Sequence, residues 1–591
     1  MGIRFLAVQS TAPLSAAKLR IATGINALAM TWNSMISPQK EQFLMSETSK
    51  KQNFLQGAAL LAIATAIVKV IGAFYKLPLN MAIGAEGYSY FTTAYDIYAV
   101  MNLIATAGLP VAVSRMISQT STLNATNRLK KVFQTALTIF SVLGILTTVV
   151  MMAGAKVLAN VMNQPDAWIS ILCLGPCGIL ICLISAYRGF FNGQSNMFPT
   201  SVSQVIEALG KLLVGLALAF AIVGATGNVS YAAGGAIIGV TIGAALALLY
   251  LMVKFRRAYQ QLPQTQEDTG STKDTAKALL AIAIPITIGS AGLQLLTVIE
   301  SGLYMDRLVY LIETNQYMGH MVQTAGSAQK AAATLKGLFN MTQTIFNMPC
   351  AFIIPITVSV LPAVTSYLTV KNHTAVRDTE ESAARITGLL SLPCAVGLAV
   401  LARPIMALLG GYEGEQLELS AQFMAIQGIT VFLYAIIQYT NALLQSHGYE
   451  NVPVVNMLSS GVIRLVLVYV MVGNPSLGLM GAPLGAFIGY LLIAVLNLTA
   501  IRRKVEQKPR LLKNLLRPAL PALVMGVVVF FCYRLLVSML GIDGSRIILC
   551  GAPIAVGALV YFVCVVLMKS ITREDCLLLP KGEKIAKLLR L

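Results

Sequence analysis

Residues 231–253 read YAAGGAIIGVTIGAALALLYLMV and contain no charged side chain. A helix of about this length crosses the roughly 30 Å hydrocarbon core of a bilayer, so the stretch predicts a transmembrane helix. Lys254, Arg256 and Arg257 follow within four residues, as expected for a span that ends at a cytoplasmic surface. The chain has 47 glycines, which allow helices to approach each other closely in lipid.

The composition of the whole chain also indicates a membrane protein. Its 591 residues are 56% hydrophobic and 11% charged, with a mean hydropathy of +0.73. Soluble globular proteins carry about 25% charged residues, so this chain has too little polar surface to cover a water-soluble particle of its size. Its apolar runs are long and continuous, which favours membrane-spanning helices over the alternating strands of a transmembrane barrel.

Windows of about 20 apolar residues predict fourteen transmembrane helices and therefore an all-α polytopic membrane protein. The predicted windows are 54–75, 88–113, 132–155, 167–187, 200–223, 231–253, 278–302, 338–361, 386–410, 421–445, 453–473, 481–501, 516–540 and 546–568.

The positive charges predict the orientation of these helices. If the sides alternate from a cytoplasmic N-terminus, 32 of the 43 Lys and Arg residues lie on the cytoplasmic side and 7 on the other. This bias is the positive-inside pattern, and it places both termini in the cytoplasm. The net charge of +19 then faces anionic lipid headgroups, which excludes nucleic acid as the partner.

Other chemistries leave no signature in the sequence. None of the nine cysteines forms a Cys-x-x-Cys pair, and the three histidines lie in polar segments. We therefore expect no metal site and no cofactor. The chain also lacks a phosphate-binding loop and a Gly-x-Ser-x-Gly motif, so we expect a protein that is not an enzyme.

An internal repeat organises the predicted spans. Leu109-Pro110 with Ser114 recurs as Leu361-Pro362 with Ser366, and the hexapeptide at 59–64 recurs at 278–283. Repeats in one orientation predict two six-helix lobes related by an axis along the membrane normal. The expected parts are a poorly ordered N-terminal extension (1–50), a first lobe (51–257), a cytoplasmic linker (258–276), a second lobe (277–504), two extra spans (505–570) and a cytoplasmic tail (571–591).

Several short sequence motifs resemble those of the MOP exporter superfamily. They are KVIGAFYK (69–76), AGLP (107–110), RGFFNGQ (188–194) and LLQ (443–445) with Gly448 and Pro453. The likeness is to the polysaccharide-transport branch, which includes stage V sporulation protein B-like proteins and lipid II flippases. It implies a two-lobe transporter in a bacterial plasma membrane that moves an undecaprenyl diphosphate-linked oligosaccharide from the inner to the outer leaflet.

The resemblance also implies where the substrate binds. Lipid II flippases carry basic residues on span 1 inside a central cavity, and Lys69 matches the first of them. Lys76 directly follows the position of the second, whereas Asn102 replaces a further basic residue in span 2. The corresponding stretch of span 8, around Gln343, carries no arginine, which leaves the exact substrate open.

Lys69 and Lys76 are the main candidates for a substrate site on physical grounds. A lysine at mid-bilayer depth costs roughly 2.5–3.5 kcal/mol, so Lys69 needs a wet cavity, an acid or an anionic ligand. Lys76 is two helical turns further along the same face, and two cations on one stripe suit a diphosphate. The alternative for Lys76 is that it extends to the outer surface.

Other polar residues within spans extend the candidate site. We expect Asp96 and Asn102 in span 2, Gln294 in span 7, and Gln343 and Asn347 in span 8 to line one cleft, unless they only form hydrogen bonds between helices. Four charged residues complete the set. Arg115 at a cytoplasmic span end could meet an incoming headgroup, and Arg464 needs a partner on another helix. Glu207 and Lys211 have the spacing of a structural pair.

The leading functional prediction is a flippase for a lipid II-type precursor that works by alternating access. Its energy would come from a coupling ion or from the membrane potential. Three alternatives stay open: an exporter of another lipid-linked polysaccharide unit, a cation-coupled multidrug antiporter, and a scaffold for wall or spore-coat assembly that transports nothing.

Overall fold

The computed structural model describes residues 38–106, 108–123, 125–262, 271–315, 322–323, 325–506, 508–541 and 544–572, and within them it contains helices and no strands. Most of the predicted N-terminal extension and C-terminal tail, and the middle of the predicted linker, lie outside these ranges. Residues 38–50 of the predicted extension are helical, because they form the start of α2 (Pro38–Thr106).

The helices form two consecutive halves and a short C-terminal addition. The first half continues from α2 with α3 (Leu109–Thr122), α4 (Thr126–Ala153), α5 (Ala155–Val161), η1 (Pro165–Ala167), α6 (Trp168–Leu174), α7 (Cys177–Gly193), α8 (Phe198–Thr226) and α9 (Val229–Gln260). The second half contains α10 (Thr272–Asn315), α12 (Ala328–Thr369), α13 (His373–Val400), α14 (Ala402–Ile405), η2 (Met406–Gly410), α15 (Gly414–Ser446), α16 (Asn451–Val472), η3 (Gly478–Met480) and α17 (Gly481–Lys504). The addition comprises α18 (Leu511–Leu516), α19 (Ala519–Leu540) and α20 (Arg546–Leu567).

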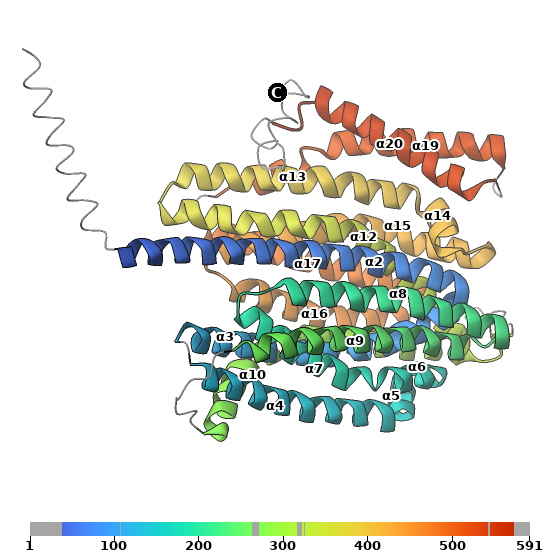
Figure 1. Ribbon diagram of the computed structural model, residues 1–591. Helices are drawn as coiled ribbons and strands as arrows, with labels where there is room; N and C mark the ends of the chain where they lie inside the picture. The colour runs from blue at the N-terminus through green and yellow to red at the C-terminus, as the bar shows by residue number, and fades with distance from the viewer. Residues whose placement is uncertain are drawn as a thin grey trace, which may run out of the picture.

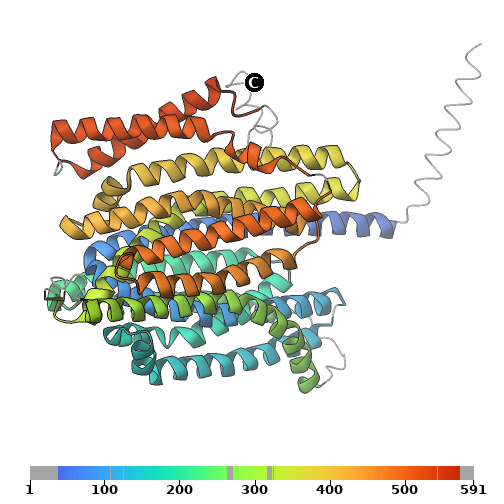
Figure 2. The same cartoon turned by 180° about the vertical axis from the view of Figure 1, so that it is seen from behind.

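The long helices lie side by side in one stack (Figures 1 and 2). The α19–α20 hairpin forms one edge of the stack beside α13, and α4 forms the opposite edge (Figure 1). Helix α2 lies between the two halves, since it packs against α8 and α9 of the first half and against α10 and α12 of the second. It is therefore the element best placed to carry groups shared by both halves.

Eleven helices among the described residues are long and apolar enough to cross a membrane. The all-helical, multi-pass class predicted from the sequence is confirmed, whereas the count of fourteen is not. The window 54–75 and most of the window 88–113 share the single element α2, and the last residues of the second window belong to α3. Within α2 the chain turns at Gly84 (φ 66°, ψ 179°), a conformation open mainly to glycine. The windows 278–302 and 338–361 fall in α10 and α12, which are 44 and 42 residues long.

Glycines bring α8 and α9 into backbone contact. A Cβ atom on Gly210 would lie 2.5 Å from the Cα atom of Gly243, and one on Gly243 would lie 2.5 Å from the carbonyl oxygen of Glu207. Gly239 is packed equally tightly against Gly215. Such close approach is how small residues associate helices in lipid, so the glycines of residues 231–253 build this interface.

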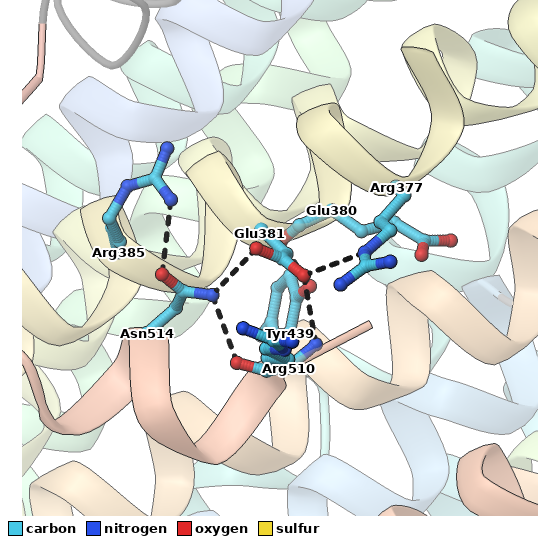
Figure 3. A network of polar contacts seen from close by, with 7 residues as sticks. All are labelled: Arg377, Glu380, Glu381, Arg385, Tyr439, Arg510 and Asn514. Atoms are coloured by element: carbon cyan, nitrogen blue, oxygen red, sulfur yellow. Dashed lines mark hydrogen bonds and ion pairs between the residues drawn. The ribbon is translucent and has the colours of Figure 1, made fainter. Parts of the chain in front are cut away.

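A partly buried polar network attaches α18, and with it the α19–α20 hairpin, to α13 (Figure 3). The Glu381 carboxylate accepts hydrogen bonds from Arg377 Nε (3.0 Å), from the Arg510 backbone N–H (3.0 Å) and from Asn514 Nδ2 (3.1 Å). Arg385 donates to Asn514 Oδ1 at 3.0 Å. The network thus joins the start of α13 to residues about 130 positions later in the chain.

Replacing Glu381 with alanine is expected to loosen α18 from α13. The change removes the acceptor of the Arg510 N–H and one of the two acceptors of Asn514 Nδ2, which should lower the free energy of unfolding by about 1–3 kcal/mol. Thermal unfolding of the purified protein and hydrogen exchange of residues 508–541 measure the effect. Asp378→Asn, an exposed carboxylate on the same helix, is the matched control, and equal behaviour of the two variants would contradict this role of the network.

Candidate functional site

A cavity of about 430 Å³ lies between α2 of the first half and α10, α12, α16 and α17 of the second. Five ionisable groups of opposite sign line it, namely Lys76, Asp96, Glu300, Lys336 and Arg464. The remaining wall is a mixture of amides, hydroxyls and apolar side chains. A polar chamber bounded by both halves is the kind of site that two-lobe transporters use.

The first charged cluster lies where α2 meets α12. Lys76 precedes the turn at Gly84 and Asp96 follows it, so this turn brings both to one chamber. Lys336 of α12 is 1% exposed, and its Nζ donates to Thr93 Oγ1 at 3.0 Å. Ser301 Oγ of α10 donates to Asp96 Oδ2 at 3.0 Å, which ties three helices together at this point.

This cluster carries more positive than negative charge. Asp96 interacts electrostatically with Lys336 and, less strongly, with Lys76. In the part of the chain that the structure describes, however, no carboxylate lies within ion-pair distance of either ammonium group. Two lysines therefore face the chamber with one shared acid between them, an arrangement that favours an anionic ligand.

The second charged cluster lies deeper in the second half. Arg464 of α16 forms an ion pair with Glu300 of α10, which supplies the partner that the sequence analysis sought for this arginine. Gly489 of α17 leaves room for the arginine, because a Cβ atom there would lie 2.9 Å from Arg464 Cδ. The Arg464 guanidinium also lies 6.0 Å from the centre of the Tyr490 ring. The positive charge of Arg464 and the negative charge of Glu300 therefore cancel at this end of the chamber.

Helix α12 supplies a polar wall that also bridges the two halves. Gln343 and Asn347 line the chamber. One turn away, Asn340 Nδ2 donates to Thr92 Oγ1 at 2.6 Å, and Thr344 Oγ1 shares a 2.7 Å hydrogen bond with the Tyr88 hydroxyl. These polar residues of α2 and α12 thus face each other, and they serve both as cavity lining and as contacts between helices.

The structure brings some of the predicted site residues together and separates others. Lys76, Asp96, Gln343, Asn347 and Arg464 all line the chamber. Four others do not belong to its lining, namely Lys69, Asn102, Arg115 and Gln294. Lys69 and Arg115 are exposed. Lys69 shares the face of Lys76 on α2 but lies two turns away, beyond the chamber, so its role in binding stays a prediction.

Glu207 and Lys211, predicted as a structural pair, each make their direct contact with another group. Glu207 forms an ion pair with Arg188 of α7 at 3.0 Å. Lys211 Nζ donates to the Tyr95 hydroxyl at 3.2 Å and lies 4.3 and 4.9 Å from the ring centres of Tyr95 and Tyr75. The i, i+4 spacing allowed the pair, but groups on neighbouring helices compete for both side chains.

Lys336 is the site residue that the sequence analysis missed. The hydropathy window began at residue 338, so Lys336 was counted with the loop before it. Helix α12 begins ten residues earlier, at Ala328, behind the N-cap Ser327, whose side chain accepts from the Lys330 N–H. A capping serine ahead of the Ala331–Ala333 run was the signal that would have placed Lys336 inside the helix.

Within the described ranges, no group of three or more His, Cys, Asp or Glu side chains has the geometry to hold a metal ion. The chamber contains just two carboxylates, and one of them, Glu300, is paired with Arg464.

A multi-pass helical protein with a polar, cation-bearing chamber between its two halves belongs to the class of membrane transporters. Residues 54–368 match the family model described as "Polysaccharide biosynthesis protein", and residues 312–542 match that of "Lipid II flippase MurJ". The chain therefore belongs to the polysaccharide biosynthesis protein family, as a MOP-superfamily flippase of the MurJ and stage V sporulation protein B type. The resemblance inferred from sequence is confirmed.

Similar proteins cover nearly the whole chain. It is 24% identical to stage V sporulation protein B of Bacillus subtilis (strain 168) over 536 residues, which cover 90% of this chain and 98% of that protein. The lipid II flippase MurJ of the same organism is 24% identical over 533 residues, covering 86% and 94% of the two chains.

Two solved structures have the same fold. A lipid II flippase MurJ in an inward closed conformation matches with a TM-score of 0.64 at 14% identity, covering 88% of this chain and all of that one. An inward-facing MATE multidrug transporter of the MOP superfamily matches with a TM-score of 0.57 at 15% identity, covering 74% and 98% of the two chains.

Proposed function

We propose that this protein translocates a polyprenyl diphosphate-linked precursor of the cell wall, of the lipid II type, from the inner to the outer leaflet of a bacterial plasma membrane. The observation that carries the proposal is the meeting of Lys76 and Lys336 at one chamber between the two halves. Each ammonium lacks an ion-pair partner in the described residues. A diphosphate group supplies the negative charge that this arrangement favours.

Ionisable side chains within membrane-spanning segments are costly to insert, and they generally mark a substrate or ion path. Lys336 is almost completely buried and receives no neutralising acid at contact distance. Binding of a diphosphate would recover this cost by charge-assisted hydrogen bonds.

Alternating access follows from the position of the chamber. The first half and the second half would act as two lobes that rock about α2, with the chamber open to one leaflet at a time. The excess of Lys and Arg on one side of the predicted spans supports an orientation with both termini in the cytoplasm. The α19–α20 hairpin, which is apolar and stands at the edge of the stack (Figure 1), would offer the polyprenyl tail a path in the lipid.

The proposal is tested by reconstitution into liposomes. A fluorescent polyprenyl diphosphate carrying a disaccharide is placed in both leaflets, and a membrane-impermeant quencher reports how fast the protected fraction reaches the outer leaflet. We expect exchange with the protein at a rate well above that of empty liposomes. Exchange equal to that of empty liposomes, from protein that is folded by thermal unfolding, would refute the proposal.

The same preparation separates the proposed substrate from the alternatives. Precursors with other sugars on the same carrier test export of a different polysaccharide unit. Uptake of a cationic dye tests the multidrug alternative, which the fold and the carboxylates of Asp96 and Glu300 keep relevant. The excess of ammonium groups beside Asp96 favours the anionic substrate over the cationic one.

A further inference from the structure

A second polar pocket lies away from the chamber, between the second half and the C-terminal hairpin. It has a volume of about 470 Å³. Its wall comes from α14, η2 and the start of α15 on one side and from α19 and α20 on the other. Two arginines line it, Arg403 of α14 and Arg546 of α20, and neither belongs to the lining of the chamber. The pocket is therefore a separate site, to which transport of the precursor assigns no role.

Both guanidinium groups lie against other residues around the pocket and remain accessible. Arg546 donates to the carbonyl oxygen of Ala407 at 3.4 Å and forms an ion pair with Glu413, and both of these partners line the pocket. Arg403 forms an ion pair with Glu418 at 2.7 Å. The side chains of Arg403 and Arg546 are 31% and 43% exposed, so a molecule that enters the pocket can reach them.

The acidic partners leave both arginines available to an anion. The side chains of Glu413 and Glu418 are 78% and 56% exposed, and exposed ion pairs contribute little stability. A phosphate group can therefore share or replace these partners, since arginine binds phosphate oxygens through charge-assisted hydrogen bonds. Glu413 also lines the pocket, so the same ligand meets a carboxylate beside the two cations. A group that carries both a phosphate and an ammonium matches this combination of charges.

The position of the pocket indicates that this group belongs to a lipid. Arg546 is the first residue of α20, and Arg403 lies three residues beyond the end of α13. Both helices are long and apolar enough to span a membrane, and charged residues at the ends of such helices lie among lipid headgroups. Ile547 and Ile548 follow Arg546 and are exposed, which gives acyl chains an apolar surface beside the arginines. In the predicted orientation this end faces the outer leaflet.

We propose that the pocket between Arg403 and Arg546 binds the headgroup of a zwitterionic aminophospholipid of the outer leaflet. The two guanidinium groups bind the phosphodiester, and the Glu413 carboxylate accepts hydrogen bonds from the primary ammonium. The acyl chains lie along the exposed face of α20. Because the pocket wall is shared by the second half and the hairpin, a bound lipid holds α20 against η2. This inference goes beyond the proposed transport and does not depend on which precursor the chamber carries.

The test measures how two fluorescent lipids with identical acyl chains, phosphatidylethanolamine and phosphatidylglycerol, bind to the full-length protein in detergent. We expect roughly threefold or more tighter binding of the ethanolamine lipid, because the glycerol headgroup lacks the ammonium that Glu413 accepts. Arg546→Gln should weaken both lipids roughly threefold to tenfold, since it removes one of the two phosphate-binding cations. Glu413→Gln should abolish the preference, because it removes only the partner of the ammonium.

The matched control is Arg534→Gln, which removes an exposed arginine of the same hairpin from outside the pocket lining. It should change neither affinity, and thermal unfolding without added lipid shows that each variant is folded. Equal affinity of the unmodified protein for the two lipids, or unchanged binding by folded Arg546→Gln, would overturn the proposal. Soluble glycerophosphoethanolamine should bind far more weakly than the lipid. Equally tight binding of this soluble compound would overturn the assignment to a lipid.

Discussion

Lys336→Gln is expected to lower the rate of precursor translocation roughly tenfold to a hundredfold. Lys336 Nζ lies at the contact between α2 and α12, donates to Thr93 and has no carboxylate at ion-pair distance in the described structure. Glutamine retains a donor but removes the charge, and a hydrogen bond to a charged group contributes about 1.5–3 kcal/mol. The liposome quenching assay measures the rate directly.

The control for this prediction is Lys330→Gln. Lys330 lies on the same helix six residues earlier and is exposed, so its replacement removes the same charge outside the chamber. It should leave translocation within about twofold of the unmodified protein. A Lys336→Gln variant that is folded and translocates at the unmodified rate would show that this lysine does not contact the substrate.

Gly337→Ala is expected to slow translocation at least tenfold by preventing the two halves from closing. Gly337 of α12 packs so tightly on α2 that a Cβ atom would overlap the carbonyl oxygen of Ala85. Because this contact is backbone against backbone, no flexible side chain can yield. We expect the α2–α12 end of the chamber to stay open, with a rate loss of at least tenfold.

A cysteine introduced at Gln343, which lines the chamber, reports this state. In the Gly337→Ala background this cysteine should react faster than in the otherwise unmodified protein, when a membrane-impermeant thiol reagent is applied at the α2–α12 end of the chamber. Gly397→Ala is the matched control, because a Cβ atom on Gly397 of α13 has nothing within 4 Å. Normal translocation by Gly337→Ala would show that this contact can relax and is not needed for closure.

The sequence by itself determined the class of the protein and part of the candidate site. Hydropathy is a local property, so windows of about 20 residues were enough to show an all-helical, multi-pass chain. Helical periodicity is local as well, and it placed Gln343 and Asn347 on one face of a helix. Asp96 was found because an ionisable residue inside an apolar window is costly, and Lys76 because it lies two helical turns beyond Lys69 on the same face.

The tertiary structure alone decided which charges meet. Arg464 pairs with Glu300, 164 residues earlier, and Glu207 binds Arg188 although Lys211 has the better spacing on its own helix. Lys336 joined the chamber and Lys69 did not, because the turn at Gly84 and the packing of α12 on α2 set where the chamber begins. Partners on different helices are chosen by packing geometry, and no local pattern of residues encodes that choice.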